Sequence, residues 1–341
     1  MAVATIAQST VRMRPAMIYV ALGAFALLAS VLALGIGHGD LDDARLRPTL
    51  LALRGWRLGA AALTGAALAV GGVIVQGLFR NPLADPAILG TTAGASLGGQ
   101  LALALYDAVL AGRVAFSVAP RTLLPLGCLA GAFVALGIVL VIARRARDRV
   151  LLLLAGFVLT SLFLSVGNFV LSTAQESWEL GRAMIAFVMG GLGGTGGDEL
   201  LAAAPLVLIG IGAAWLWGRP LDLLLSGEEE SAALGVDVPA VRRWTIVWAA
   251  MLTGAAVSLG GNIGFVGLVV PHALRPFVGW EHRALVPAAA LGGAGFVIAC
   301  DVVTRVLPTR TELPLGVVTG LIGAPAFLWL LLRSHREGFD G

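Results

Sequence analysis

The chain has 341 residues, of which 58% are hydrophobic and only 13% are charged, and its formal net charge is +3 at pH 7. Soluble domains carry about a quarter charged residues, so this composition excludes an ordinary water-soluble protein. Apolar runs recur along the whole length, and many approach the roughly 20 residues that a bilayer core requires. We therefore expect an integral membrane protein without a sizeable soluble domain.

The basic residues are all arginine, because the sequence contains no lysine. The phosphate-binding loop of P-loop ATPases needs a lysine to reach the nucleotide phosphates, so ATP-driven activity would have to come from a partner. The two cysteines, Cys128 and Cys300, lie within apolar segments and are too few for a thiolate metal site. We expect no enzyme activity, no bound metal and no cofactor in this chain.

In chain order, the apolar segments predict one membrane domain, residues 1–341, that crosses the bilayer about ten times. Polar or Pro/Gly-rich breaks separate the segments, and backbone within lipid must be helical or covered by protein. The expected fold class is therefore an all-α integral membrane bundle. The expected helices are residues 14–36, 50–79, 86–106, 120–142, 150–172, 198–217, 241–260, 263–278, 284–305 and 314–333.

Arginine is unevenly distributed between the two sides of this arrangement. Residues 144–149 are rich in arginine, and Arg219, Arg242 and Arg243 flank a second loop on the same side. Arginine-rich loops remain in the cytoplasm, so these two loops and both chain ends are expected there. A smaller group runs against this rule on the opposite side: Arg45, Arg47, Arg54 and Arg57.

The loop after the second predicted helix reads Arg80-Asn81-Pro82-Leu83-Ala84-Asp85-Pro86. An Asp at an N-cap followed by Pro in the first turn is a common start signal for a helix. Two prolines also stiffen a short loop, as a gate or a partner-contact loop requires. The residues themselves leave both roles open.

The fifth predicted helix carries a polar stripe, which we define as Ser161, Ser165, Asn168 and Ser172. Their spacing places all four on one helical face. Such side chains often hydrogen-bond neighbouring helices within a membrane. The alternative is that the polar stripe lines a water-filled pathway with uncharged groups.

Residues 219–243 form the longest polar stretch on the arginine-rich side. Its centre, Gly227–Val236, mixes carboxylates with Leu and Ala and could form two short helices around Gly235. A solvated loop is one interpretation. The mixture of charged and apolar residues favours a surface that docks into another protein.

The centres of the predicted helices are almost free of charged residues. Secondary transporters commonly place ionisable groups there for ion or proton coupling, so a stand-alone carrier or channel is the weaker hypothesis. Asp301 and Arg305 lie near an outer helix end, and His272 is expected to be a packed residue rather than a ligand. A purely structural membrane subunit is a third hypothesis.

Four segments together resemble the FecCD-type permeases of ABC importers for iron-siderophores, haem and cobalamin. They are residues 65–69, Gln76–Pro86, Gly264–His272 and Glu312–Thr319. The resemblance covers nearly the whole chain and implies a type II ABC importer permease fold in a bacterial inner membrane. The implied cargo is an iron chelate, either haem or a ferric siderophore, with cobalamin as the alternative.

The resemblance also implies partners. A second permease subunit, expected to be another copy of this chain, would complete the pathway within the lipid bilayer. Two ATPase subunits would hold ATP and magnesium on the cytoplasmic side, and a periplasmic binding protein would deliver the cargo from outside. No nucleic acid is expected as a partner.

Roles for particular residues follow from the same resemblance. The polar stripe would line the translocation pathway, and Asn81, Pro82 and Leu83 would form the cytoplasmic gate together with the loop between the fourth and fifth helices. Arg54, Arg57 and Arg305 would dock the binding protein, because guanidinium groups pair bidentately with carboxylates. Residues 219–243 would couple the chain to the ATPase, through Gly227, Glu228, Glu229, Ala232, Leu234 and Gly235.

Overall fold

The computed structural model describes residues 15–37, 39, 42–87, 89–110, 120–145, 149–175, 177–307 and 312–339. All regular structure within these ranges is α-helical, which confirms the expected fold class. The helices are α1 (Pro15–Gly35), α2 (Arg47–Leu78), α3 (Thr91–Leu110), α4 (Pro120–Arg145), α5 (Arg149–Ala174), α6 (Trp178–Met189), α7 (Gly197–Leu216), α8 (Gly218–Leu225), α9 (Glu228–Ala233), α10 (Val238–Gly260), α11 (Val266–Val278), α12 (His282–Val306) and α13 (Leu315–Phe339).

Each of the ten expected helices overlaps one observed helix. Six of these are long and apolar enough to cross a bilayer: α1, α2, α4, α5, α7 and α12. By contrast, α11 has 13 residues and is about 20 Å long, too short for a hydrocarbon core of about 30 Å. It therefore enters the bundle without spanning it.

The prediction for the start of the third helix was wrong. Pro86, Ala87, Leu89 and Gly90 lie in turns instead, and Gly90 has a left-handed φ of 79°. The N–H of Thr91 still donates to the Pro86 carbonyl at 3.3 Å, so the first helical turn is delayed to Thr91. The two short helices around Gly235 exist as α8 and α9, but both precede that residue, and α6 was not expected.

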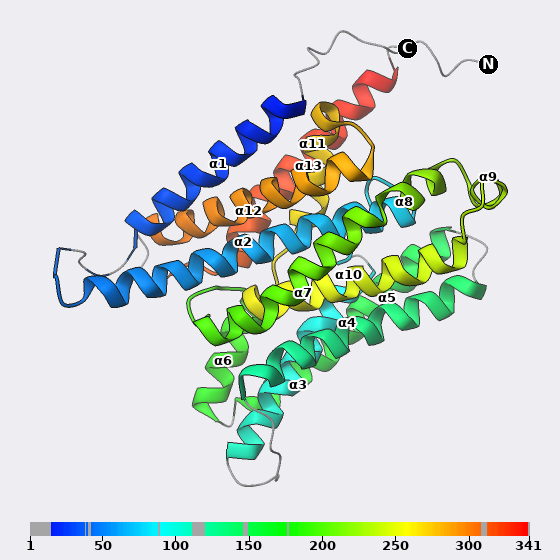
Figure 1. Cartoon of the computed structure of the whole chain (residues 1–341). Coiled ribbons are helices and arrows are strands. Elements are labelled where there is room, and N and C mark those ends of the chain that lie inside the picture. The colour runs from blue at the N-terminus through cyan, green and yellow to red at the C-terminus, as the bar shows by residue number, and fades with distance from the viewer. Residues whose placement is uncertain are drawn as a thin grey trace.

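The helices run between two ends of the molecule (Figure 1). At one end, here the termini end, lie the start of α1, the end of α13, and α8 and α9. The opposite, arginine end holds Arg54, Arg57 and Arg305. Helices α1 and α12 run in the same direction, since the Tyr19 hydroxyl donates to the Ala284 carbonyl at 2.7 Å near one end and Arg305 reaches Ala33 near the other.

Helix α2 forms the centre of the subunit. It has 32 residues, and 78% of its most apolar stretch is buried. Its inner positions are mainly Gly, Ala and Val, which let neighbouring backbones approach closely. At Gly72, an added methyl group would overlap the carbonyl oxygen of Gly267 at the start of α11. The small residues of α2 therefore allow the short helix α11 to pack against it.

Three chain turns meet inside the bundle, where α6 and α10 end and α13 begins. The Gly191 N–H donates to the Gly260 carbonyl at 2.9 Å, and the Leu315 N–H donates to the Gly190 carbonyl at 2.9 Å. Gly261 has a φ of 67°. Non-helical backbone is tolerated at membrane depth where protein covers it and satisfies its hydrogen bonds. The chain therefore reverses direction inside the bundle at these turns, and α6, α10 and α13 begin or end there.

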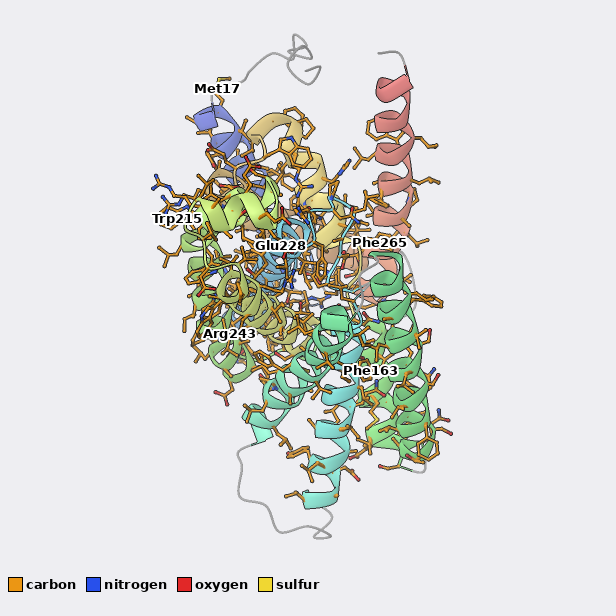
Figure 2. The ribbon with its side chains drawn as sticks, turned by 90° about the vertical axis from the view of Figure 1, so that its right-hand side faces the viewer. Met17, Phe163, Trp215, Glu228, Arg243 and Phe265 are labelled. Atoms are coloured by element: carbon orange, nitrogen blue, oxygen red, sulfur yellow. The ribbon has the colours of Figure 1, made fainter. Side chains whose placement is uncertain are left out.

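Helix α5 lies at the edge of the subunit. In Figure 2, α5, which carries Phe163, and α13 both stand at the right-hand edge of the view. Only 17% of the apolar stretch of α5 is buried. One broad helical face thus remains uncovered by the rest of the same chain.

Candidate functional site

Arg54 and Arg305 both bind the carbonyl groups at the end of α1. Arg54 is 7% exposed, and its guanidinium donates to Leu34 at 2.7 Å and to Gly37 at 3.0 Å. The Nη1 of Arg305 donates to the carbonyls of Ala33 and Ile36, both at 2.8 Å. Cations and donors are favourable at a helix C-terminus, where carbonyl groups lack partners. These two arginines therefore fix the end of α1.

Arg57 belongs to a neighbouring ion-pair cluster at the same end, defined as Arg57, Asp301, Arg305 and Glu312. Arg57 Nε donates to Asp301 at 2.9 Å, and its Nη1 donates to Glu312 at 2.9 Å. Asp301 also accepts from Arg305 Nη2 at 2.7 Å. Asp301 is almost fully buried, whereas the Glu312 side chain is 37% exposed. The charges of the two arginines and the two carboxylates cancel. Glu312 is the most exposed member of the cluster.

The polar stripe lies on the uncovered face of α5. Ser161, Ser165, Asn168 and Ser172 are all exposed in the single chain. Leu159, Phe163 and Gly167 on the opposite face are buried. The hydroxyls of Ser161 and Ser165 donate to the carbonyls four residues earlier, at 3.0 and 2.8 Å. Serines satisfied in this way offer little attraction to a passing molecule.

Asn168 is the residue of the polar stripe that most restricts what can surround this face of α5. Its side-chain amide carries two donors and an acceptor, and placing such a group against hydrocarbon without partners is costly. Helix α5 presents it away from the helices of its own subunit. This arrangement suits a helix covered by another subunit or by water.

The expected gate residues lie in the loop between α2 and α3, at the termini end. Asn81 Oδ1 accepts a hydrogen bond from the Leu83 N–H at 2.9 Å, which closes an Asx turn over Pro82. The Asn81 N–H donates a hydrogen bond to the Gln76 carbonyl at 3.1 Å. The turn is therefore tied to the end of α2, and Leu83 projects from it with 37% exposure.

Asp85 closes the same loop and is buried. Its Oδ1 accepts from the Ala87 N–H at 2.7 Å, which closes an Asx turn, and its exposure is 8%. Burial raises the pKa of Asp85 to about 6, because desolvation penalises the charged carboxylate. The loop between α2 and α3 is thus a structured element with its own titratable group. The second expected gate element includes residues 146–148, which lie outside the described part of the chain.

The expected ATPase-contact residues form a compact projection at the termini end. Gly227 and Gly235 have φ values of 130° and 84° and enclose α9. Only glycine adopts such angles without strain. The Ser231 hydroxyl donates to the Leu223 carbonyl at 2.7 Å, which anchors α9 to α8. The expected contact residues Glu228, Glu229, Ala232, Leu234 and Gly235 are exposed on this projection, as is Glu230.

A cavity of about 440 Å³ lies between this projection, the end of α4 and the start of α10. The Glu228 carboxylate lies 2.6 Å from Arg242 Nη2 at its rim, and both side chains are close to half exposed. Leu234, at the end of α9, is 62% exposed. An exposed apolar side chain close in sequence to exposed carboxylates is typical of a protein interface.

The partners of several site residues were not foreseen from the sequence. Asp301 and Glu312 balance Arg57, although they lie 244 and 255 positions away along the chain. Asp222 binds His282 across the termini end, with Nδ1 and Oδ1 2.6 Å apart. His272 packs edge-on against Phe327 at a centroid distance of 6.3 Å, which agrees with its interpretation as a packed residue.

Comparison with known proteins gives matches along nearly the entire chain. The sequence model of the FecCD transport family matches residues 3–333. A solved structure of a metal-chelate type ABC transporter in an inward-facing conformation is similar to this chain with a TM-score of 0.80 and 29% identity. The alignment covers 94% of this chain and 99% of that one.

Three curated relatives carry different cargo names. The cobalamin import system permease protein BtuC of Halobacterium salinarum is 41% identical, and the alignment covers 79% of this chain and 69% of that protein. The hemin transport system permease protein HmuU of Yersinia pestis is 39% identical, with 81% of each chain covered. The Fe(3+) dicitrate transport system permease protein FecD of Escherichia coli is 36% identical, covering 82% and 83%.

Proposed function

This chain belongs to the FecCD transport family and is a permease of an ABC importer, and we propose that its cargo is an iron chelate, either haem or a ferric siderophore. The match over residues 3–333 is the observation that supports the proposal, together with relatives whose names specify hemin and Fe(3+) dicitrate. The protein is an integral membrane protein. We place it in a bacterial inner membrane, with both chain ends in the cytoplasm.

The proposed pathway runs along the polar stripe, between two copies of this chain. Burial of α5 on one face and exposure of Ser161, Ser165, Asn168 and Ser172 on the other support this arrangement. A second copy would shield Asn168 from lipid and leave a narrow hydrated space between the two helices. Uncharged hydroxyl and amide groups then hydrate the space without binding the cargo strongly.

The projection formed by α8 and α9 is the proposed contact for ATPase subunits that hold ATP and magnesium. Its exposed carboxylates, Leu234 and the adjacent cavity support this proposal. The loop holding Asn81, Pro82 and Leu83 lies at the same end and is the proposed cytoplasmic gate. ATP hydrolysis in the partner would move the projection, and the gate would respond.

The arginine end is the proposed docking surface for a periplasmic binding protein. Arg57 is the arginine best placed for a carboxylate of that protein, because it pairs with the half-exposed Glu312. Arg54 and Arg305 would reach a carboxylate only by exchanging bonds that now hold the end of α1. Docking at these three arginines would therefore loosen or reposition α1.

Cobalamin is the alternative cargo. The 41% identity to the Halobacterium salinarum cobalamin permease supports it directly. Nothing in the polar stripe distinguishes a corrinoid from another bulky chelate, since its groups are uncharged. The binding protein is therefore the expected source of selectivity.

The test is transport by proteoliposomes that contain this chain with its cognate ATPase and binding protein. Haem, a ferric siderophore and cobalamin are compared as loaded ligands, with ATP hydrolysis and uptake measured together. Stimulation by haem or the siderophore supports the proposed cargo, and stimulation by cobalamin alone replaces it. Uptake by this chain without the ATPase would contradict the proposed coupling.

A further inference from the structure

His282, the first residue of α12, lies at the termini end between the projection formed by α8 and α9 and the end of α2. Its exposure is 2%. Asp222 of α8 binds it twice through one oxygen: the backbone N–H donates to Oδ1 at 3.0 Å, and Nδ1 lies 2.6 Å from the same Oδ1. An ionised carboxylate only accepts hydrogen bonds, so Nδ1 is the donor. This pair anchors α8 to α12.

The other side of the imidazole rests on the backbone of α2. A methyl group at Gly77 would overlap His282 Nε2, so only glycine leaves room for the ring there. The carbonyl of the same Gly77 accepts from the Arg80 N–H at 3.2 Å, at the beginning of the proposed gate loop. His282 thus contacts the residue from which this loop departs.

Adjacent contacts hold the start of α12 against the end of α7 and the first residue of α8. The indole N–H of Trp215 donates to the Arg283 carbonyl at 3.2 Å, and the Arg283 guanidinium lies 5.3 Å from the Trp215 ring centroid. A methyl group at Gly218 would lie 3.0 Å from the Arg283 side chain, so α8 has little space to slide. A displacement of α9 therefore passes through α8 to the start of α12.

We infer that His282 is a positioning residue that transmits movement of α8 and α9 to the gate loop, residues 79–85, through its paired contacts with Asp222 and Gly77. This inference rests on the proposed function for the direction and purpose of the movement. A simple helix cap would need only the backbone N–H at position 282. The buried ring, with one nitrogen on α8 and the other against α2, does more than a cap requires.

Two substitutions separate the two sides of the ring. In His282→Asn the amide nitrogen takes the place of Nδ1, so the bond to Asp222 is kept and the contact with Gly77 is lost. In His282→Gln the side chain extends toward Gly77, and the donor to Asp222 is displaced. Glu281→Gln is the matched control, because Glu281 is exposed and its side chain makes no capping hydrogen bond to α12.

Hydrogen–deuterium exchange of the full chain in lipid nanodiscs tests the contact without any partner. His282→Asn is expected to raise exchange in residues 79–85 at least about threefold, since a lost contact increases local opening, while α8 stays protected. Asp222→Ala is expected to raise exchange in the same loop from the α8 side. Changes confined to α8 and the start of α12 in both variants would overturn the inference.

Coupling is measured in proteoliposomes with the cognate ATPase, the binding protein and its loaded ligand. His282→Asn is expected to keep ATP hydrolysis within about twofold and to lower cargo moved per ATP at least about tenfold, because small misplacements of positioned groups have large rate effects. An unchanged ratio would overturn the inference. If the wild-type chain binds no ATPase, the proposed function fails, and the exchange result still decides whether His282 links α8 to the gate loop.

Discussion

Helices α2 and α5 are both apolar enough to cross a membrane, yet they occupy opposite environments. In α2, 78% of the apolar stretch is buried, whereas in α5 the value is 17%. The inner positions of α2 are small, while α5 exposes large side chains such as Phe157 and Phe169 beside the polar stripe. Hydropathy therefore identifies a membrane helix, and side-chain size and polarity indicate what the helix faces.

This difference divides the subunit into a fixed core and an uncovered face. Helix α2 packs with α10, α11 and α12 through small residues. Arg57 lies in its N-terminal third, and the proposed gate loop follows its C-terminus. Helix α5 packs on one side only and presents Asn168 to its surroundings. Substitutions in α2 should affect folding first, and substitutions in the polar stripe should affect transport first.

The largest expected effect is at Gly72 in α2. Gly72→Ala would place a methyl group onto the Gly267 carbonyl oxygen, and the backbone of α11 would have to move. We expect a loss of at least about 3 kcal/mol of stability, at the upper end of overpacking effects. Thermal unfolding in detergent and folded yield measure it. Gly137→Ala in α4 is the control, because a methyl group added there would have no atom within 4 Å; equal loss in both variants would contradict the description of α2 as the tightly packed core.

The polar stripe should respond in the opposite way. Ser165→Leu combined with Asn168→Leu is expected to leave thermal stability unchanged and to lower transport at least about tenfold, because pore-lining groups control hydration and passage. Leu208→Met on α7 is the control, since Leu208 is 61% exposed and lies outside the proposed pathway. Normal transport by the double variant would remove α5 from the pathway and favour a purely structural role for the polar stripe.

Asp85, in the loop that follows α2, gives the core a pH dependence. Its folded-state pKa is raised to about 6 from an unfolded value of 3.8, so the folded protein binds the proton more tightly. The resulting stabilisation is complete below pH 3.8 and is lost as the pH rises through about 6. The shift corresponds to about 3 kcal/mol as an upper figure. Thermal unfolding across this pH range should therefore show falling stability.

Asp85→Asn should flatten that pH profile, because the amide keeps an oxygen acceptor for the Ala87 N–H and removes the buried charge. Glu230→Gln, which removes an exposed carboxylate on α9, should leave the profile of the wild type intact. A profile that stays steep in Asp85→Asn would assign the pH dependence to another group.

The smallest effect is expected where α2 meets the start of α13. Glu312→Gln weakens the pair that occupies Arg57, and the binding protein should dock about two- to fivefold more tightly, as expected for one partly exposed ion pair. Surface plasmon resonance at low salt measures it, with Asp43→Asn at the same end as control. Weaker docking would mean that Glu312 itself belongs to the docking surface.

Much of the fold was predictable, because a membrane helix can be recognised from the run of apolar residues within its own segment. Each of the ten expected segments overlaps a helix, and the residues of the polar stripe share the exposed face of α5 that their spacing indicated. The last helix begins within one residue of its expected start, but the short helix α6 and the hydrogen bonds that join the turns at Gly190, Gly260 and Leu315 were not predictable. Such pairings leave no local periodicity in the sequence.

In the candidate site, the sequence indicated single residues but not the residues that pair with them. The arginines of the outer side were noticed as an excess of charge, but their partners Asp301 and Glu312 lie on α12 and just before α13. The same holds for Asp222 and His282, which are 60 positions apart. Glycine at position 77 gave no signal alone, because its role is to make room for a ring from another helix.

Water access to the uncovered face of α5 decides whether the proposed pathway exists. Ser165→Cys and, as a control, Leu208→Cys are compared for reaction with a membrane-impermeant maleimide in the assembled transporter, and the native Cys128 and Cys300 are buried. The proposed pathway predicts that Ser165→Cys reacts, that loaded binding protein with ATP changes its rate, and that Leu208→Cys remains unreactive. Equal lack of reaction at both positions would place the polar stripe against lipid or a dry interface and contradict the proposed pathway.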